Sequence, residues 1–196
     1  MTVQTARLKN RDLLQPVHRT GAMSAYALRA PIAADAPALA ALGRESFSAA
    51  FAHLYAPEDL AAFLDEVHDE AAVARRIASP NRVYRLATSA DGTLAGYCHL
   101  VLRDSFEPAS TALRPITLSQ LYCAGSATGS GLGTALMDWA LAEARTWGAD
   151  EMRLSVWAGN HGAQRFYVRY GFVHVADIGF WVGQQRDDEF LYTLKL

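Results

Sequence analysis

The stretch from Thr128 to Thr134, TGSGLGT, places three glycines at alternate positions before a long helix-forming run. Backbone N–H groups at the start of a helix lack partners within the helix, and the helix dipole adds partial positive charge there. Glycines leave these N–H groups uncovered, so the stretch is suited to binding phosphate oxygens. A tight turn with positive φ angles would use the same glycines, and this structural alternative stays open.

The glycine spacing separates the known phosphate-binding loops. A P-loop requires a lysine followed by serine or threonine after its last glycine, and this stretch contains no lysine. A dinucleotide fingerprint would need its third glycine at Thr134, and the following strand, which ends in VWAGN, lacks the expected acidic residue. Both motifs are excluded, and with them a dinucleotide-dependent oxidoreductase.

The elements that must position this loop follow from hydrophobic periodicity. Alternating segments and helical runs give the order strand, two helices, three strands, helix, strand, helix and two strands. This order indicates an α/β fold of the mixed α+β kind, with one sheet covered by helices on both faces. The expected strands are 25–32, 82–89, 94–103, 116–123, 151–157, 172–183 and 189–196, and the expected helices are 34–51, 56–79, 132–147 and 160–170.

Composition limits the class of protein. A chain of 196 residues with 51% hydrophobic residues predicts one domain, 25–196, after a flexible N-terminal extension, 1–24, that has no regular pattern. The net charge of −2 gives no reason to expect nucleic acid or an anionic membrane as partner. No apolar run approaches the roughly 20 residues that span a bilayer. The two cysteines lie in apolar segments, which favours a reducing, cytoplasmic location.

Two linked segments resemble the GNAT superfamily of acyl-CoA-dependent N-acetyltransferases. The segment 121–144, LYCAGSATGSGLGTALMDWALAEA, is similar to the strand, pyrophosphate loop and helix of that family, and 154–172, LSVWAGNHGAQRFYVRYGF, to its Asn, Phe-Tyr and Gly-Phe segment. The segment 44–64 and the closing strands look more like the PaiA-type branch, which is associated with polyamine acetylation. The resemblance implies a mixed, mostly antiparallel, twisted sheet of about seven strands with about four helices, splayed after the fourth strand.

The resemblance also implies acetyl-CoA as acyl donor, with no metal. It assigns Tyr167 as the acid that protonates the CoA sulfur and the backbone N–H of Cys123 as the oxyanion donor. From the residues alone, Tyr167 reads as a core tyrosine and Asn160 as a helix N-cap. The implied cofactor-binding residues are Leu121, Tyr122, Cys123, Thr128, Gly129, Ser130, Gly131, Leu132, Gly133, Thr134, Asn160, Phe166 and Tyr167.

The loop departs from the family pattern at two positions. Thr128 stands where the family usually has Gln or Arg, and Ser130 stands in place of a basic residue. We expect weaker CoA binding rather than none, because the loop acts mainly through backbone N–H groups. The hydroxyls of Thr128, Ser130 and Thr134 could each donate a hydrogen bond to phosphate.

The acceptor side has no motif. An ammonium acceptor must lose a proton, and the candidate bases are Glu45, His53, His99 and Asp104, with a water chain as the alternative. Glu45 also fits a solvated helix face, and His99 a buried sheet histidine. Phe47, Phe51 and Tyr55 are expected to wall an acceptor pocket, although a core-facing stripe explains them equally well.

The expected reaction is direct transfer of acetyl from acetyl-CoA to a primary amine of a small, polyamine-like molecule in a ternary complex. A covalent acyl-thiol on Cys123 is disfavoured because nothing near it in sequence would activate the thiol. Three alternatives stay open: a non-catalytic acyl-CoA sensor, a partner-binding domain, and acetylation of a protein or peptide amine. A homodimer is a further open alternative.

Overall fold

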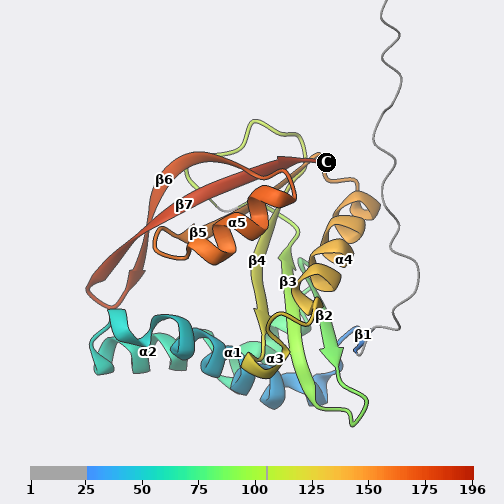
Figure 1. Cartoon of the computed structure of the whole chain (residues 1–196), viewed down its shortest axis with the longest axis vertical. Helices are drawn as coiled ribbons and strands as arrows, with labels where there is room; N and C mark the ends of the chain where they lie inside the picture. The colour runs from blue at the N-terminus through green and yellow to red at the C-terminus, as the bar shows by residue number, and fades with distance from the viewer. Residues whose placement is uncertain (1–25, 105) are drawn as a thin grey trace, which may run out of the picture.

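The computed structural model describes residues 26–104 and 106–196, so the expected extension 1–24 lies outside the described residues. Seven strands form one sheet in the order β1-β2-β3-β4-β5-β7-β6 (Figure 1). Neighbouring strands are antiparallel except β4 and β5, which are parallel. The strands are β1 (Ala27–Arg29), β2 (Arg82–Thr88), β3 (Leu94–Val101), β4 (Pro115–Cys123), β5 (Glu151–Trp157), β6 (Val173–Val182) and β7 (Gln185–Lys195).

The described ranges contain five α-helices, whereas about four are expected, because the helix expected at 56–79 is divided into two. The first half ends at Val67, and the Asp69 side chain then accepts a hydrogen bond of 2.9 Å from the N–H of Ala72. An aspartate in this position caps the start of a new helix. The helices are α1 (Ala36–Phe51), α2 (Pro57–Val67), α3 (Glu70–Ile77), α4 (Leu132–Trp147) and α5 (His161–Arg169).

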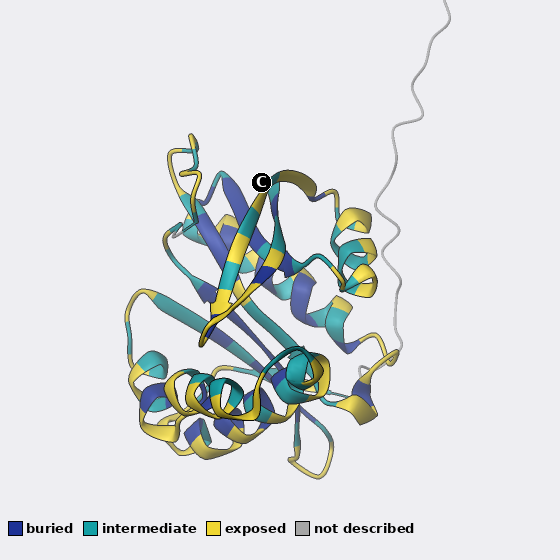
Figure 2. Ribbon diagram, turned by 90° about the vertical axis from the view of Figure 1, so that its left-hand side faces the viewer, coloured by how far each residue is buried: buried dark blue, intermediate teal, exposed yellow. Residues whose placement is uncertain are grey.

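Helices cover both faces of the sheet, as the sequence predicts. Helices α4 and α5 pack on one face, in a core that includes Leu136 and Met137. Helices α1 and α3 pack on the other face, around Leu39 and Tyr97. Figure 2 shows the buried residues concentrated along the central strands and on the inner sides of the helices. Within the described ranges, no helix is long and apolar enough to cross a membrane.

The sheet splays after β4, as the family resemblance implies. Strand β4 pairs with β5 only through Pro115–Thr117. Beyond this point β4 continues beside β3 to the pair of Cys123 with Gly96, whereas β5 continues beside β7 to the pair of Trp157 with Glu189. The two strands therefore diverge, and a gap opens between the two halves of the sheet (Figure 1).

A buried polar cluster fastens the paired end of β4 and β5. The guanidinium of Arg153 forms an ion pair with Asp104 and donates a hydrogen bond of 2.7 Å to the carbonyl of Pro108. The carboxylate of Glu151 accepts a hydrogen bond of 2.6 Å from Lys195. Because each buried charge has a partner, this end of the sheet can stay closed where the other end opens.

Gly96 permits the start of α4 to dock on β3. A Cβ atom there would lie 2.7 Å from the carbonyl oxygen of Tyr122 and 3.0 Å from the side chain of Leu132, the first residue of α4. We expect Gly96→Ala to lower the free energy of unfolding by about 1–3 kcal/mol through overpacking, measured by urea denaturation. Gly125→Ala is the matched control, since its Cβ would meet nothing within 4 Å. Equal stability of the two variants would contradict the close approach.

Candidate active site

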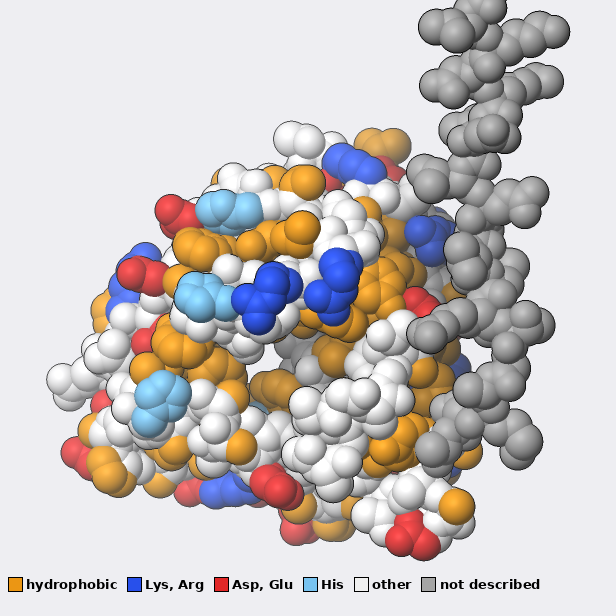
Figure 3. Space-filling view, in the orientation of Figure 1, with side chains coloured by type: hydrophobic (Ala, Val, Ile, Leu, Met, Phe, Trp, Pro, Cys, Tyr) orange, Lys and Arg blue, Asp and Glu red, His pale blue; other side chains and the backbone are white. Residues whose placement is uncertain are grey.

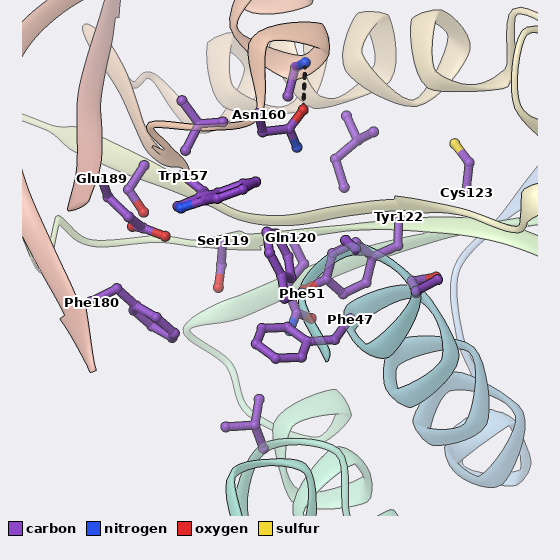
Figure 4. A pocket seen from close by; sticks show the side chains of 18 of the residues that line it. Phe47, Phe51, Ser119, Gln120, Tyr122, Cys123, Trp157, Asn160, Phe180 and Glu189 are labelled. Carbon is purple, nitrogen blue, oxygen red and sulfur yellow. Dashed lines mark hydrogen bonds between the residues drawn. The ribbon is translucent and has the colours of Figure 1, made fainter. Parts of the chain in front are cut away.

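A cavity of about 690 Å³ occupies the gap between β4 and β5. One side of the cavity is formed by the unpaired half of β4, the end of β5 and helix α5. The other side is formed by the C-terminal half of α1, the end of α2, and residues of β6 and β7 that include Asp187 and Glu189. Figure 3 shows the face of the molecule hollowed beneath α5, and Figure 4 shows side chains from these elements converging on the space. The splay of the sheet thus produces a site that neither half contains alone.

The unpaired edge of β4 supplies backbone donors to this cavity. The N–H of Ala124 donates to the carbonyl of Ala95 on β3 at 2.8 Å. Because bonded pairs alternate along an antiparallel ladder, the N–H groups of Leu121 and Cys123 point away from β3, toward the gap. An extended ligand with amide groups can pair with such an edge as an added strand would.

The glycine loop presents a cluster of free N–H groups at the start of α4. Gly129 and Gly131 have φ angles of 78° and 87°, in the left-handed region that favours glycine. The N–H groups of Gly129 and of residues 131–134 donate no backbone hydrogen bond to the described part of the chain outside α4. Ser130 and Thr128 use their hydroxyl protons within the loop, on the carbonyls of Ala127 and Ala124, which leaves backbone N–H groups as its main donors.

Tyr167 lines the cavity from α5, and its hydroxyl has no hydrogen-bond partner in the described ranges. Tyr170, the C-cap residue of the same helix, differs because its hydroxyl donates to Asp138 at 2.8 Å. Burial raises the pKa of Tyr167, so the phenol keeps its proton near neutral pH. Burial also raises the pKa of the Cys123 thiol to about 11, which makes this sulfur a poor nucleophile.

Asn160 lies at the N-terminus of α5 and lines the same cavity. Its side-chain oxygen accepts a hydrogen bond of 3.0 Å from the N–H of Ala163, drawn as a dashed line in Figure 4. The capping role that the residue type suggests is therefore present, and the amide nitrogen stays available to a ligand. Leu132 and Phe166 pack in the core beneath α4 and α5, and none of the expected residues 129–134 lines the cavity, which reaches the glycine loop only at Thr128.

The aromatic residues expected at the acceptor side do line the cavity. Phe47 lies 4.5 Å from Phe63 between ring centroids, and Phe51 meets Trp157 edge to face at 6.0 Å. Tyr55 and the exposed carboxylate of Glu45 complete the group that the sequence proposes. Aromatic surfaces of this kind bury the apolar part of an acceptor and attract a cation over the ring faces.

Three of the candidate bases are not in the cavity lining. His99 stacks on Tyr84 with ring centroids 4.1 Å apart, and burial lowers its pKa to about 3. Asp104 is held in its ion pair with Arg153. His53 contacts Trp157 at 6.0 Å between ring centroids but does not line the cavity.

Two carboxylates on β7 that are not among the expected bases also reach the cavity. Asp187 is buried and accepts a hydrogen bond from the hydroxyl of Tyr55. Burial raises the pKa of Glu189; a hydrogen bond from Ser155 opposes the rise, and repulsion from Asp187 adds to it. Glu189 begins the expected strand 189–196, and the pairing of this strand with β5, opposite Trp157, brings it into the site.

The charge of the cavity is one-sided. Its lining includes the carboxylates of Glu45, Asp187 and Glu189 and no lysine or arginine among the described residues. His68 also lines it, and burial, with Arg76 and Arg44 nearby, lowers the pKa of this imidazole to about 4. No group of three or more His, Cys, Asp or Glu residues in the described ranges could hold a metal ion.

Comparisons with known proteins agree with this geometry. Residues 45–172 match the model of the acetyltransferase (GNAT) family. An uncharacterised N-acetyltransferase of Mycobacterium tuberculosis is 33% identical over 162 residues, which cover 83% of this chain and 98% of that protein. The PaiA N-acetyltransferase of Thermoplasma acidophilum, solved in complex with coenzyme A, has a TM-score of 0.70 at 22% identity and covers 87% of this chain and 99% of that one. The spermidine/spermine N-acetyltransferase of Vibrio cholerae, solved as mutant forms, has a TM-score of 0.64 at 18% identity and covers 88% and 94%.

Gly131→Val should abolish most binding of acetyl-CoA, because a branched side chain strains the left-handed conformation and projects from the bare N–H cluster. We expect at least a tenfold weaker Kd by isothermal titration calorimetry, which corresponds to about 1.4 kcal/mol.

Gly92→Val is the control for this variant. Gly92 has a φ of 86° and equally open surroundings, but it lies in the turn between β2 and β3. The Gly92→Val protein should lose about as much stability as Gly131→Val and should keep its affinity for acetyl-CoA. Unchanged affinity in a folded Gly131→Val protein would exclude the loop as the phosphate site.

Proposed function

The chain belongs to the GNAT family of acetyltransferases, and from this premise we propose that it transfers acetyl from acetyl-CoA to a primary amine of a small, polyamine-like cation. One observation carries the proposal: a single cavity joins the free N–H groups of the β4 edge, beside the glycine loop, to the carboxylates of Asp187 and Glu189. The family itself implies acyl-CoA as the donor, and the finer choice of acceptor follows from the charge of the cavity.

The donor half of the site fits acetyl-CoA through backbone groups. The pyrophosphate would bind the free N–H groups of Gly129 and residues 131–134, where the α4 dipole adds positive charge. The pantetheine amides would pair with the β4 edge at Leu121 and Cys123. This path directs the thioester into the cavity beside Cys123 and Tyr167, and Asn160 would contact the pantetheine from the opposite wall.

The acceptor half fits a cationic amine. Carboxylates of Glu45, Asp187 and Glu189 attract an ammonium ion, and the absence of described Lys or Arg side chains in the lining leaves no competing cation. The aromatic rings of Phe51 and Trp157 add cation–π attraction and exclude water. A molecule with a second ammonium group can be held by one carboxylate while its other amine approaches the thioester, which favours a polyamine-like acceptor.

The chemistry follows from these positions. Glu189, directly or through a water molecule, takes a proton from the ammonium ion, and its raised pKa makes it a stronger base than an exposed carboxylate. The neutral amine then attacks the thioester carbonyl, and the N–H of Cys123 stabilises the oxyanion. As the C–S bond breaks, Tyr167 donates its proton to the sulfur, and the nitrogen gives up its second proton to water, which returns a proton to the Tyr167 phenolate. The products are the acetylated amine and CoA thiol, and Glu189 releases the first proton to solvent.

A non-catalytic acyl-CoA sensor is the second candidate, favoured by a loop without a basic side chain. The free hydroxyl of Tyr167 in the cavity supports the enzyme instead, because a binding domain has no need for an unpaired phenol there. A thiol-release assay over a panel of mono-, di- and polyamines separates the two. Release of CoA with none of them, while acetyl-CoA binds, would favour the sensor.

Tyr167→Phe should lower turnover by at least tenfold with little change in stability or in acetyl-CoA affinity. The change removes the proton donor, and general acids contribute about 10²- to 10⁴-fold. Tyr170→Phe is the matched control, because its hydroxyl bonds Asp138 and its loss should cost about 1 kcal/mol of stability with turnover nearly intact. The reverse pattern in the two variants would remove Tyr167 from the mechanism.

Glu189→Gln should lower kcat/KM for the amine and change its pH dependence. A base acts in its deprotonated form, so the wild-type rate rises as pH rises through the raised pKa of Glu189. This limb should vanish in the variant, leaving only the ionisation of the amine. Asp188→Asn is the control, since that exposed carboxylate pairs with Arg186 instead. An unchanged pH profile in Glu189→Gln would assign the base to another group.

A further inference from the structure

The glycine loop lacks a cation for the phosphates of CoA. The segment 121–134 contains no lysine or arginine, and none lines the cavity among the described residues. Free N–H groups and a helix dipole provide only partial positive charge, whereas CoA carries several full negative charges on its phosphates. A basic side chain from another element would complete the site.

Helix α5 brings one such side chain to the loop. The guanidinium carbon of Arg169 lies 5.8 Å from the ring centroid of Phe166. The tip of that ring lies 4.0 Å from the position of a Cβ on Gly133, in the first turn of α4. One aromatic ring therefore separates Arg169 from the N–H groups at the helix start.

Tyr170 fixes this arrangement between the two helices. Its hydroxyl bonds the carbonyl of Thr134 at 3.2 Å and the carboxylate of Asp138 at 2.8 Å. Burial and the hydrogen bond to Asp138 raise the pKa of Tyr170, and the positive charge of Arg169 opposes that rise. The last turn of α5 is thus held against the first turn of α4.

Arg169 is free to bind a ligand. Its side chain is exposed and forms no ion pair within the described ranges. Figure 3 shows basic side chains gathered over α5, above the hollow that leads to the cavity. Arg165, one turn earlier, is also exposed. Unlike Arg169, it has no cation–π contact with the Phe166 ring in the described ranges.

We propose that Arg169 binds a phosphate group at the nucleotide end of CoA and supplies the full positive charge that the loop lacks. A guanidinium matches phosphate oxygens with two parallel N–H donors, and the Phe166 ring holds it in place from below. The inference rests on acyl-CoA binding at the loop, and it does not depend on which amine is acetylated.

The test compares the Kd of CoA for the wild type, Arg169→Gln and the control Arg165→Gln by isothermal titration calorimetry. Arg169→Gln should bind about 5- to 30-fold more weakly at low salt, the range of a partly exposed charge-assisted contact, and the difference should shrink as salt screens it. Arg165→Gln should stay within about twofold, and Arg169→Lys should regain part of the loss. Wild-type affinity in Arg169→Gln would overturn the proposal.

A second ligand, 3′-dephospho-CoA, identifies the phosphate. If Arg169→Gln and the wild type bind 3′-dephospho-CoA with equal affinity, the guanidinium binds the 3′-phosphate of CoA. If Arg169→Gln still binds this ligand more weakly, the guanidinium binds the pyrophosphate. In steady-state assays the variant should raise the KM for acetyl-CoA and leave kcat unchanged. A fall in kcat at saturating acetyl-CoA would instead indicate a structural effect on Tyr167 and contradict the assignment. A wild-type protein that binds CoA but acetylates no amine would refute the proposed function alone.

Discussion

The site depends on the separation of β4 from β5 after three paired residues on each strand. Strand β5 bonds β7 from Glu151 to Trp157, and β4 bonds β3 as far as Cys123. Each ladder hydrogen bond contributes about 0.5–1.5 kcal/mol, so neither strand can move to close the gap without losing several. The unpaired edge of β4 therefore remains available, and the cavity, the free N–H groups and the acidic wall are arranged around it.

The two ends of the cavity have opposite polarity, although the whole chain has a net charge of only −2. Beside one end, which reaches the glycine loop at Thr128, the start of α4 offers free N–H groups and a positive helix dipole, which suit an anionic donor. At the other end Asp187 and Glu189 offer negative charge among aromatic rings, which suit a cationic acceptor. This separation would orient both substrates so that the thioester and the amine meet near Cys123 and Tyr167.

The parts of the site that are local in sequence could be predicted, and those that depend on strand register could not. The glycines before α4 lie within a few residues of one another, so their spacing can be recognised in the sequence. The same holds for Asn160 and Tyr167, which lie at the start and within the one short helix α5. Glu189 reaches the cavity only because β7 pairs with β5, and no local pattern in the sequence indicates that register. Conversely, His99 has the residue type of a base, but its strand directs it against Tyr84, away from the cavity.

Amide hydrogen exchange with and without acetyl-CoA tests whether one ligand occupies both the β4 edge and the start of α4. Free N–H groups exchange quickly, and a ligand that accepts their hydrogen bonds slows them. We expect protection at Leu121, Cys123, Gly129 and residues 131–134 together, with little change in β1 or β6. Protection of the loop without protection of the β4 edge, or protection of neither segment, would contradict binding of one ligand along both.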